Sequence, residues 1–156
     1  MMDGAQKTRR FRLDWLIYIL AAAGLISLLI WATTSELSRI PSRDAAADLG
    51  QYGLITIRFS TDPYPPIPTG IVTLNFMPID SRQRTVALDT LSYEYGPAGN
   101  DQPFRSGVAQ LMSDSSGMFM AGAQFPTVGD WWLRVKVAKG NVQDEVRFTF
   151  YVEPAQ

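Results

Sequence analysis

Hydrophobic residues are arranged along the chain in two patterns, one continuous and one alternating. The continuous pattern occupies Trp15–Trp31, which reads WLIYILAAAGLISLLIW and contains no charged residue. A helix rises about 1.5 Å per residue, so this stretch covers most of a hydrocarbon core that is about 30 Å thick. Lipid offers no partner to backbone N–H and C=O groups, which therefore have to pair within the segment. The pattern predicts a transmembrane helix over residues 15–32, with membrane lipid as its partner.

The charges on either side of this segment predict its orientation. The basic residues just before it are Lys7, Arg9, Arg10 and Arg12, whereas the residues after it carry charges of both signs. Basic residues remain on the cytoplasmic side of a membrane. We therefore expect a cytoplasmic tail at 1–14, the helix, a linker at 33–50 and an extracytoplasmic domain at 51–156. The long apolar run and the poor cleavage site after Trp31 favour a retained single-pass signal-anchor in the cell membrane over a cleaved signal peptide.

From residue 51 onward, hydrophobic and polar positions alternate in short segments. The clearest alternation sets Trp131, Leu133, Val135 and Val137 against Trp132, Arg134 and Lys136. Strand-like segments lie at 54–60, 71–77, 85–95, 107–112, 118–125, 130–138 and 144–152. Short strands at a spacing of about 8–12 residues, with turn residues between them, are typical of an antiparallel sandwich. The pattern predicts a mainly β fold of about seven strands, preceded by one N-terminal transmembrane helix.

Composition narrows the chemistry that this domain can perform. The chain contains no cysteine and no histidine, and its formal net charge is -1. The first absence excludes disulfides, thiolate metal sites and cysteine nucleophiles. The second excludes a Ser-His-Asp triad and removes the commonest general base. The charge shows no bias toward nucleic acid. We therefore predict no catalytic residues, no enzymatic activity and no nucleic-acid partner.

The order of several motifs resembles a known family. The motifs are Ser116–Ala121 (SGMFMA), Phe125–Pro126, Gly129–Trp131 (GDW) and the alternating strand that follows. Upstream, the proline-rich Thr61–Pro66 (TDPYPP) and Gly70 are similar to the entry of the same domains. Over residues 54–153 the chain is similar to YtkA-like domains, in the membrane-anchored arrangement of FixH-like proteins.

This resemblance implies an immunoglobulin-like β-sandwich in a bacterial protein that is exported or anchored to a membrane, so that the domain is periplasmic. FixH-type proteins are associated with cation pumps and oxidase assembly, and other relatives occur beside copper-handling proteins. The family has no well-defined catalytic residues, so the resemblance implies none here.

Methionines provide a candidate metal chemistry. Thioether sulfur selects Cu(I), and Met118 and Met120 lie two residues apart on one face of a predicted strand. Met112, across the turn at 113–117, joins them if the two strands pair. Methionine also fills irregular gaps in cores and at binding surfaces, and the absence of histidine counts against copper. We therefore expect no cofactor, with copper held by Met112, Met118 and Met120 as the alternative.

Three residues are candidates for binding a partner. Because Trp131 is expected in the core, Trp132 should face the other side of the sheet, beside Arg134. An exposed Trp beside Arg is a common interface anchor. The alternative is a Trp132 that lies flat and covers the polar face of the sheet. Tyr64 is the third candidate, since its proline-rich loop is stiff and loses little entropy on docking.

These observations leave two functions open. The first is a non-catalytic, membrane-anchored extracytoplasmic binding module, which serves as an accessory subunit or assembly factor of a membrane complex. In that case the small residues Ala21–Gly24 either pack against helices of a membrane-protein partner or face lipid. The second is an extracytoplasmic protein that handles copper(I) with methionine ligands.

Overall fold

The computed structural model divides the chain into two units, and each is described by itself. The description covers residues 18–19, 21–27, 41–68, 70–114 and 116–155. The first unit is Met1–Arg39 and the second is Ile40–Gln156. The described residues of the first unit are helical. Within these ranges, no helix has both the length and the apolar character that crossing a membrane requires. The predicted tail at 1–14, both ends of the predicted span (Trp15 and Trp31) and residues 33–40 lie outside the described residues.

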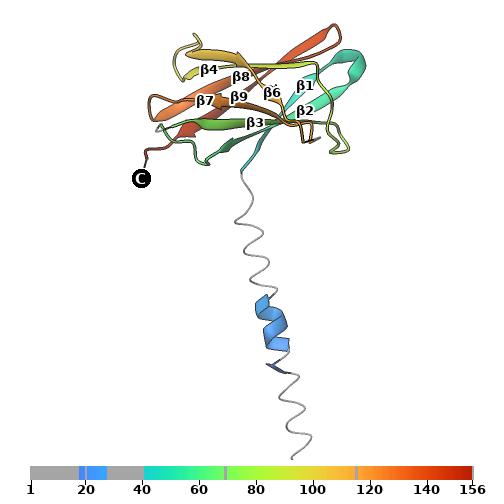
Figure 1. The fold of residues 1–156 in the computed structure, drawn as a ribbon, viewed down its shortest axis with the longest axis vertical. Coiled ribbons are helices and arrows are strands. Elements are labelled where there is room, and N and C mark those ends of the chain that lie inside the picture. Colours follow the sequence, from blue (N-terminus) through green and yellow to red (C-terminus); the bar gives the residue numbers. More distant parts are fainter. Residues whose placement is uncertain (1–17, 20, 28–40, 69, 115, 156) are drawn as a thin grey trace, which may run out of the picture. The chain divides into compact units, whose positions relative to one another are not determined.

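The second unit is a sandwich of two antiparallel sheets, which confirms the predicted mainly β fold (Figure 1). Its described residues form nine strands, two more than predicted. The strands are β1 (Arg43–Asp48), β2 (Leu54–Asp62), β3 (Val72–Ile79), β4 (Thr90–Pro97), β5 (Arg105–Val108), β6 (Gln110–Leu111), β7 (Phe119–Ala123), β8 (Gly129–Lys139) and β9 (Val142–Val152). One sheet has the order β1-β2-β3-β7-β6, and the other has the order β5-β4-β8-β9.

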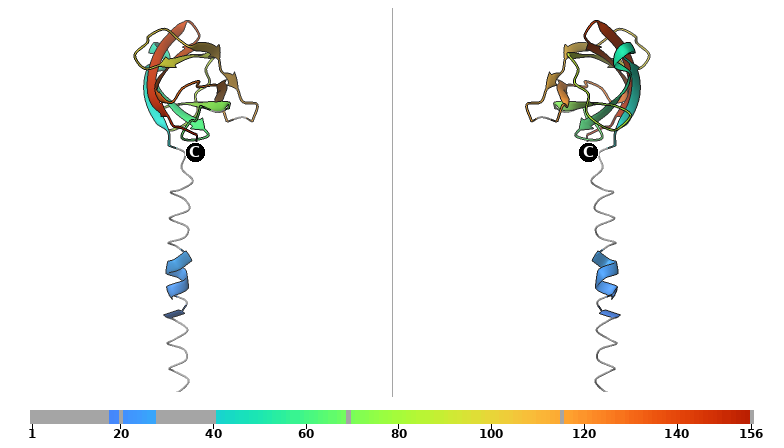
Figure 2. Two further views of the ribbon diagram at one scale, coloured as in Figure 1. Left: turned by 90° about the vertical axis from the view of Figure 1, so that its left-hand side faces the viewer. Right: turned by 90° about the vertical axis from the view of Figure 1, so that its right-hand side faces the viewer.

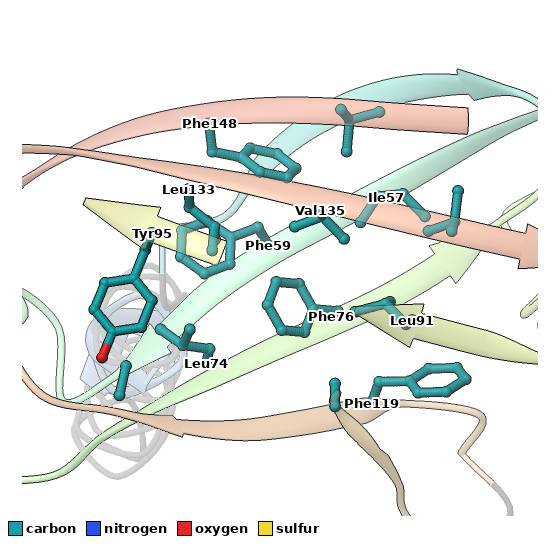
Figure 3. Packing of buried hydrophobic residues seen from close by; sticks show 14 of the residues in the cluster. Ile57, Phe59, Leu74, Phe76, Leu91, Tyr95, Phe119, Leu133, Val135 and Phe148 are labelled. Carbon is teal, nitrogen blue, oxygen red and sulfur yellow. The ribbon is translucent and has the colours of Figure 1, made fainter. Parts of the chain in front are cut away.

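Alternation places one face of each long strand in a core between the sheets. The buried residues include Val72, Leu74 and Phe76 of β3, and Val146, Phe148, Phe150 and Val152 of β9. Figure 3 shows residues of β8 and β9 facing residues of β2 and β3 across this core. The ring centroid of Phe59 lies 5.2 Å from that of Phe148 in the opposite sheet and 5.6 Å from that of Phe76 in its own. The contact between Phe59 and Phe148 joins the two sheets.

Trp131 is a central core residue, as the sequence predicts. Its exposed fraction is 1%, and its ring centroid lies 5.1 Å from that of Phe125 and 6.0 Å from that of Tyr95. The indole Nε1 donates a hydrogen bond of 3.1 Å to the carbonyl of Thr127. A buried indole N–H needs such a partner, so this bond lets the side chain enter the core without an unsatisfied donor.

The predicted linker at 33–50 is wrong over its last part, because residues 43–48 form strand β1. This strand pairs with β2 along its whole length, from Arg43 opposite Phe59 to Asp48 opposite Leu54. Ala47 and Leu49 have exposed fractions of 0%. Alanine is small and only weakly hydrophobic, and the sequence RDAAAD of residues 43–48 shows no alternation of hydrophobic and polar residues, so it is a poor signal of a strand. The folded domain therefore includes residues 43–50 and does not begin at 51.

Strand β1 also lies beside β9 of the other sheet and so covers one side of the sandwich (Figure 2). Arg43 donates a hydrogen bond from its guanidinium to the carbonyl of Thr149. The N–H of Asp48 donates to the carboxylate of Asp144 over 2.6 Å. The opposite edges of the two sheets belong to β5 and β6.

The strand predicted at 107–112 is divided at Ala109 into β5 and β6, which belong to different sheets. Val108 pairs with Ser92 of β4, whereas Gln110 pairs with Met120 of β7. Ala109 between them is 5% exposed, and its N–H donates to the carbonyl of Leu91 over 2.9 Å. The chain thus crosses from one sheet to the other within a single residue and leaves the space between β5 and β7 open.

A carboxylate organises the turn after β3. Asp80 accepts hydrogen bonds from the N–H groups of Arg82 and Arg84, at 2.8 Å and 2.9 Å, and from the guanidinium of Arg84 at 2.7 Å and 2.9 Å. The backbone N–H of Arg84, followed by its side chain, lowers the pKa of Asp80. A group whose pKa is lowered by folding stabilises the folded state above its ordinary pKa, near 3.9, and loses that effect as pH falls through the lowered value.

We therefore expect Asp80→Asn to reduce the stability of the domain at neutral pH. The asparagine side chain has no negative charge and so cannot replace the carboxylate that accepts two hydrogen bonds from the guanidinium of Arg84. The difference from the wild type should shrink as pH falls from about 4 through the lowered pKa of Asp80, because the wild-type carboxylate is then protonated in the folded state as well. Urea denaturation midpoints at pH 7 and at pH 2.5 measure both values. A difference that is the same at the two pH values would contradict the role given to the charge.

Candidate functional site

A groove of about 660 Å³ lies on the open side of the sandwich, where the chain passes from β5 to β6. We name it the β7-edge groove. Its lining consists of Thr73, Tyr93, Val108, Gln110, Leu111, Met112, Ser113, Met120, Ala121 and Gly122. None of these side chains carries a charge at neutral pH. The volume falls within the range of about 300–1,000 Å³ that is usual for ligand sites.

The groove exists because β6 is too short to cover β7. Only Phe119 and Met120 of β7 have partners in β6, which are Leu111 and Gln110. If β6 continued in the same register, Val108 would lie opposite Gly122. Val108 pairs with β4 instead, so the outer edge of β7 beyond Met120 has no strand beside it among the described residues.

Two tyrosines of β4 reach across to this free edge. The hydroxyl of Tyr95 donates to the carbonyl of Gln124 at 3.2 Å and accepts from its N–H at 3.1 Å. The hydroxyl of Tyr93 donates to the carbonyl of Gly122 at 3.3 Å. Burial raises the pKa of Tyr93, so its hydroxyl remains a donor at neutral pH. Tyr95 thus satisfies both backbone groups of Gln124, whereas Tyr93 reaches only the carbonyl of Gly122.

The structure brings two of the three candidate copper ligands to this groove. Met112 and Met120 line it, and both are half-buried. Met118 does not line it, although its carbonyl accepts a hydrogen bond of 2.8 Å from the N–H of Met112. Within the described residues, no group of three or more His, Cys, Asp or Glu side chains has a geometry that could hold a metal ion. The soft donors in the lining of the groove are the thioether sulfur atoms of Met112 and Met120.

The expectation that Trp132 is exposed is wrong. Trp132 does face away from Trp131, but its exposed fraction is 1%. Its Nε1 donates a hydrogen bond of 2.7 Å to the carbonyl of Asn100 in the loop between β4 and β5. Gly96 faces the indole so closely that a Cβ atom there would lie 2.8 Å from the ring. Trp132 therefore fits the alternative expectation, in which its ring covers the outer face of the sheet. The loop between β4 and β5 in turn covers the ring.

Arg134 is held by groups of its own domain. Its guanidinium contacts Glu94 at 2.5 Å and Glu145 at 3.0 Å, and its centre lies 5.1 Å from the ring centroid of Trp132. The hydrogen bond that Arg134 donates to the carboxylate of Glu94 is the main reason that the pKa of Arg134 is raised. A guanidinium with two carboxylate partners and a stacked ring would have to give up these contacts to bind another protein, which argues against Arg134 as an interface anchor.

Tyr64 lies apart from the groove and remains exposed. Its exposed fraction is 51%, and it lines a hollow of about 140 Å³ together with Pro65, Pro66 and Tyr151. Thr61 also lines this hollow, and its buried hydroxyl has no hydrogen-bond partner among the described residues. Tyr64 therefore keeps the accessibility that a contact residue needs, whereas Trp132 is buried.

Comparisons assign the chain to no known group. No family model matches the chain, and no curated protein or solved structure is significantly similar to it.

Sequence reasoning missed the β7-edge groove because it treated residues 107–112 as one strand. Gly107 was the available signal, since a glycine inside a strand often marks a close approach of another group. A Cβ atom at Gly107 would lie 2.9 Å from the hydroxyl oxygen of Tyr93. Gly122 lies on the other wall, and the residues around it in the sequence do not indicate that its backbone lacks a neighbouring strand.

Proposed function

We propose that the protein is a non-catalytic, membrane-anchored binding module that serves as an accessory subunit or assembly factor of a membrane complex. The observation that carries this proposal is the β7-edge groove, an open and uncharged hollow beside a strand whose outer edge is only partly covered. A groove with an incomplete sheet edge is suited to recognising another protein, because peptide segments add to such edges.

The anchor and the location of the domain are parts of the same proposal. The uncharged Trp15–Trp31 segment supports a single span, and the basic residues before it support an N-terminus inside and the sandwich outside the cytoplasm. The motif order between residues 54 and 153 supports an immunoglobulin-like, YtkA-like domain in the arrangement of FixH-like proteins. The absence of histidine and cysteine from the sequence supports a role without catalysis.

Purification of the native full-length protein in a mild detergent tests this proposal. We expect one or more membrane proteins to co-purify in fixed proportion, to be identified by mass, and to remain through size-exclusion chromatography. A preparation of a truncated chain without residues 1–32 should lose the membrane association. If the intact protein runs alone at every detergent concentration tested, the proposal of a subunit or assembly factor fails.

A second candidate function is the handling of copper(I), favoured by the presence of Met112 and Met120 in one groove. Thioether sulfur prefers Cu(I) among the metals available to proteins. Titration with Cu(I) under reducing conditions should then detect a site that disappears in the double variant Met112→Leu/Met120→Leu. Loss of the site in Met118→Leu as well would bring the third methionine into the ligand set. Absence of binding by the wild type would remove this candidate.

A further inference from the structure

The backbone of Gly122 presents an unused donor to the β7-edge groove. The N–H and C=O groups of one strand residue point to the same edge, and those of the next residue point to the opposite edge. The carbonyl of Met118 accepts from Met112 and that of Gly122 accepts from Tyr93, so both residues direct their backbone groups away from β3. The N–H of Gly122 therefore faces the groove, and it has no acceptor among the described residues.

The contact that occupies the Gly122 carbonyl is a weak one. Its distance of 3.3 Å exceeds the usual length of an O–H···O bond, which is about 2.7–2.8 Å. A carbonyl oxygen also has a second lone pair. Gly122 can therefore exchange one N–H···O bond in each direction with an incoming strand without first losing Tyr93.

We propose that the β7-edge groove receives an extended, uncharged segment of a partner protein, which pairs as a strand with β7 at Gly122. This inference rests on the proposed function and names the surface that the binding module uses. The added segment would take the place that Val108 would occupy if β6 continued past Gln110 in its register with β7.

The walls of the groove indicate the side chains that this segment carries. Val108 and Leu111 are 64% and 58% exposed. Ile71 is 69% exposed and lies close enough to Gly122 that a Cβ atom there would be 3.3 Å from its methyl group. An extended segment directs alternate side chains to opposite faces, so one set would contact these apolar residues. A charged side chain would lose water in a groove whose lining offers no opposite charge, which favours an uncharged segment.

The probe for this proposal is a blocked pentapeptide of alternating valine and threonine, added to the full-length protein in detergent micelles. We expect the peptide to shift the amide signal of Gly122 in nuclear magnetic resonance spectra and to slow the hydrogen exchange of that amide. A peptide with an N-methyl group at its central residue cannot donate to the Gly122 carbonyl. It should bind about tenfold more weakly.

Two variants at Gly122 separate the backbone N–H from the space around it. Gly122→Pro removes the N–H but breaks no bond to β3, because this N–H faces the other edge, where proline is tolerated. Gly122→Ala adds the same Cβ atom and keeps the N–H. We expect Gly122→Pro to weaken peptide binding by about tenfold or more and Gly122→Ala to retain most of it.

A charge placed on the wall provides an independent test. Leu111→Glu should abolish binding of the peptide, whereas Leu54→Glu should not, because Leu54 is 64% exposed but lies on β2 away from the groove. Both positions are exposed, so both variants should fold.

Several outcomes would overturn the inference. Equal binding by the wild type and Gly122→Pro would do so, as would self-association of the protein through this edge or failure of the wild type to bind the peptide at millimolar concentration. Co-purification distinguishes this failure from that of the proposed function. If Leu111→Glu retains the co-purifying proteins, the module binds elsewhere; if the wild type has no co-purifying protein at all, the proposed function fails.

Discussion

A fragment of residues 51–156 is expected to lack a stable fold, whereas a fragment of residues 41–156 is expected to unfold cooperatively. The shorter fragment loses β1, its pairing with β2 and the buried Ala47 and Leu49. Burial of a leucine contributes about 1.5–3 kcal/mol, and each backbone hydrogen bond contributes about 1 kcal/mol more. The total is about 5 kcal/mol or more, comparable with the whole stability of a marginal domain. Circular dichroism during urea denaturation of both fragments measures the difference.

Two neighbouring alanines of β1 provide a control for this prediction. Ala47 is fully buried, whereas Ala46 faces the solvent. In the longer fragment, Ala47→Asn should destabilise the domain strongly, because it forces an amide into the core without a partner. Ala46→Asn should change the stability by about 0.5 kcal/mol or less. If the fragment of residues 51–156 unfolds at the same urea concentration as the longer one, residues 43–50 are a linker after all.

The long strands of the domain could be predicted because their two faces differ sharply in hydrophobicity. In β8, Leu133, Val135 and Val137 are buried while Lys136 between them is exposed. β9 follows the same rule from Val146 to Val152. One face of each strand packs on the opposite sheet and the other face is more exposed. Hydrophobic and polar residues therefore alternate in the sequence as buried and exposed positions alternate along the strand.

β1 and the crossing at Ala109 could not be predicted in the same way, because small residues carry little hydrophobic signal. Ala47 is buried by contacts with residues far away in the sequence, and neither its size nor its neighbours reveal this. Ala109 is buried because the chain changes sheets there. A change of sheet is a property of the tertiary structure, so the strand-like sequence of residues 107–112 gives no sign of it.

The two tryptophans at 131 and 132 show one feature that the sequence predicts and one that it does not. Alternation predicted correctly that they face opposite sides of β8. It did not predict that the loop between β4 and β5 would fold over the outer side, where Asn100 accepts the hydrogen bond of Trp132 and the guanidinium of Arg147 stacks on the same ring. Whether a residue on the outer face of a sheet is exposed depends on such loops, and local sequence does not record their position.

Trp132→Ala is expected to destabilise the domain by about 3–5 kcal/mol, which is the usual effect of removing a buried aromatic side chain. The variant loses the hydrogen bond to Asn100 and the surface on which Arg134 and Arg147 stack. It also leaves a cavity next to Gly96, whose lack of a side chain makes room for the ring. Urea denaturation of residues 41–156, followed by far-ultraviolet circular dichroism, measures the change without depending on tryptophan emission.

Three further variants show whether Trp132 acts in the structure or at an interface. Trp131→Ala should cost a similar amount, since Trp131 is equally buried. Trp132→Phe should cost less, because it keeps most of the ring and loses mainly one hydrogen bond worth about 0.5–1.5 kcal/mol. Tyr151→Ala, at a position that is 50% exposed, should change the stability by about 0.5 kcal/mol or less. If Trp132→Ala is as harmless as Tyr151→Ala but abolishes co-purification, Trp132 is an interface anchor and its burial beneath the loop does not persist in solution.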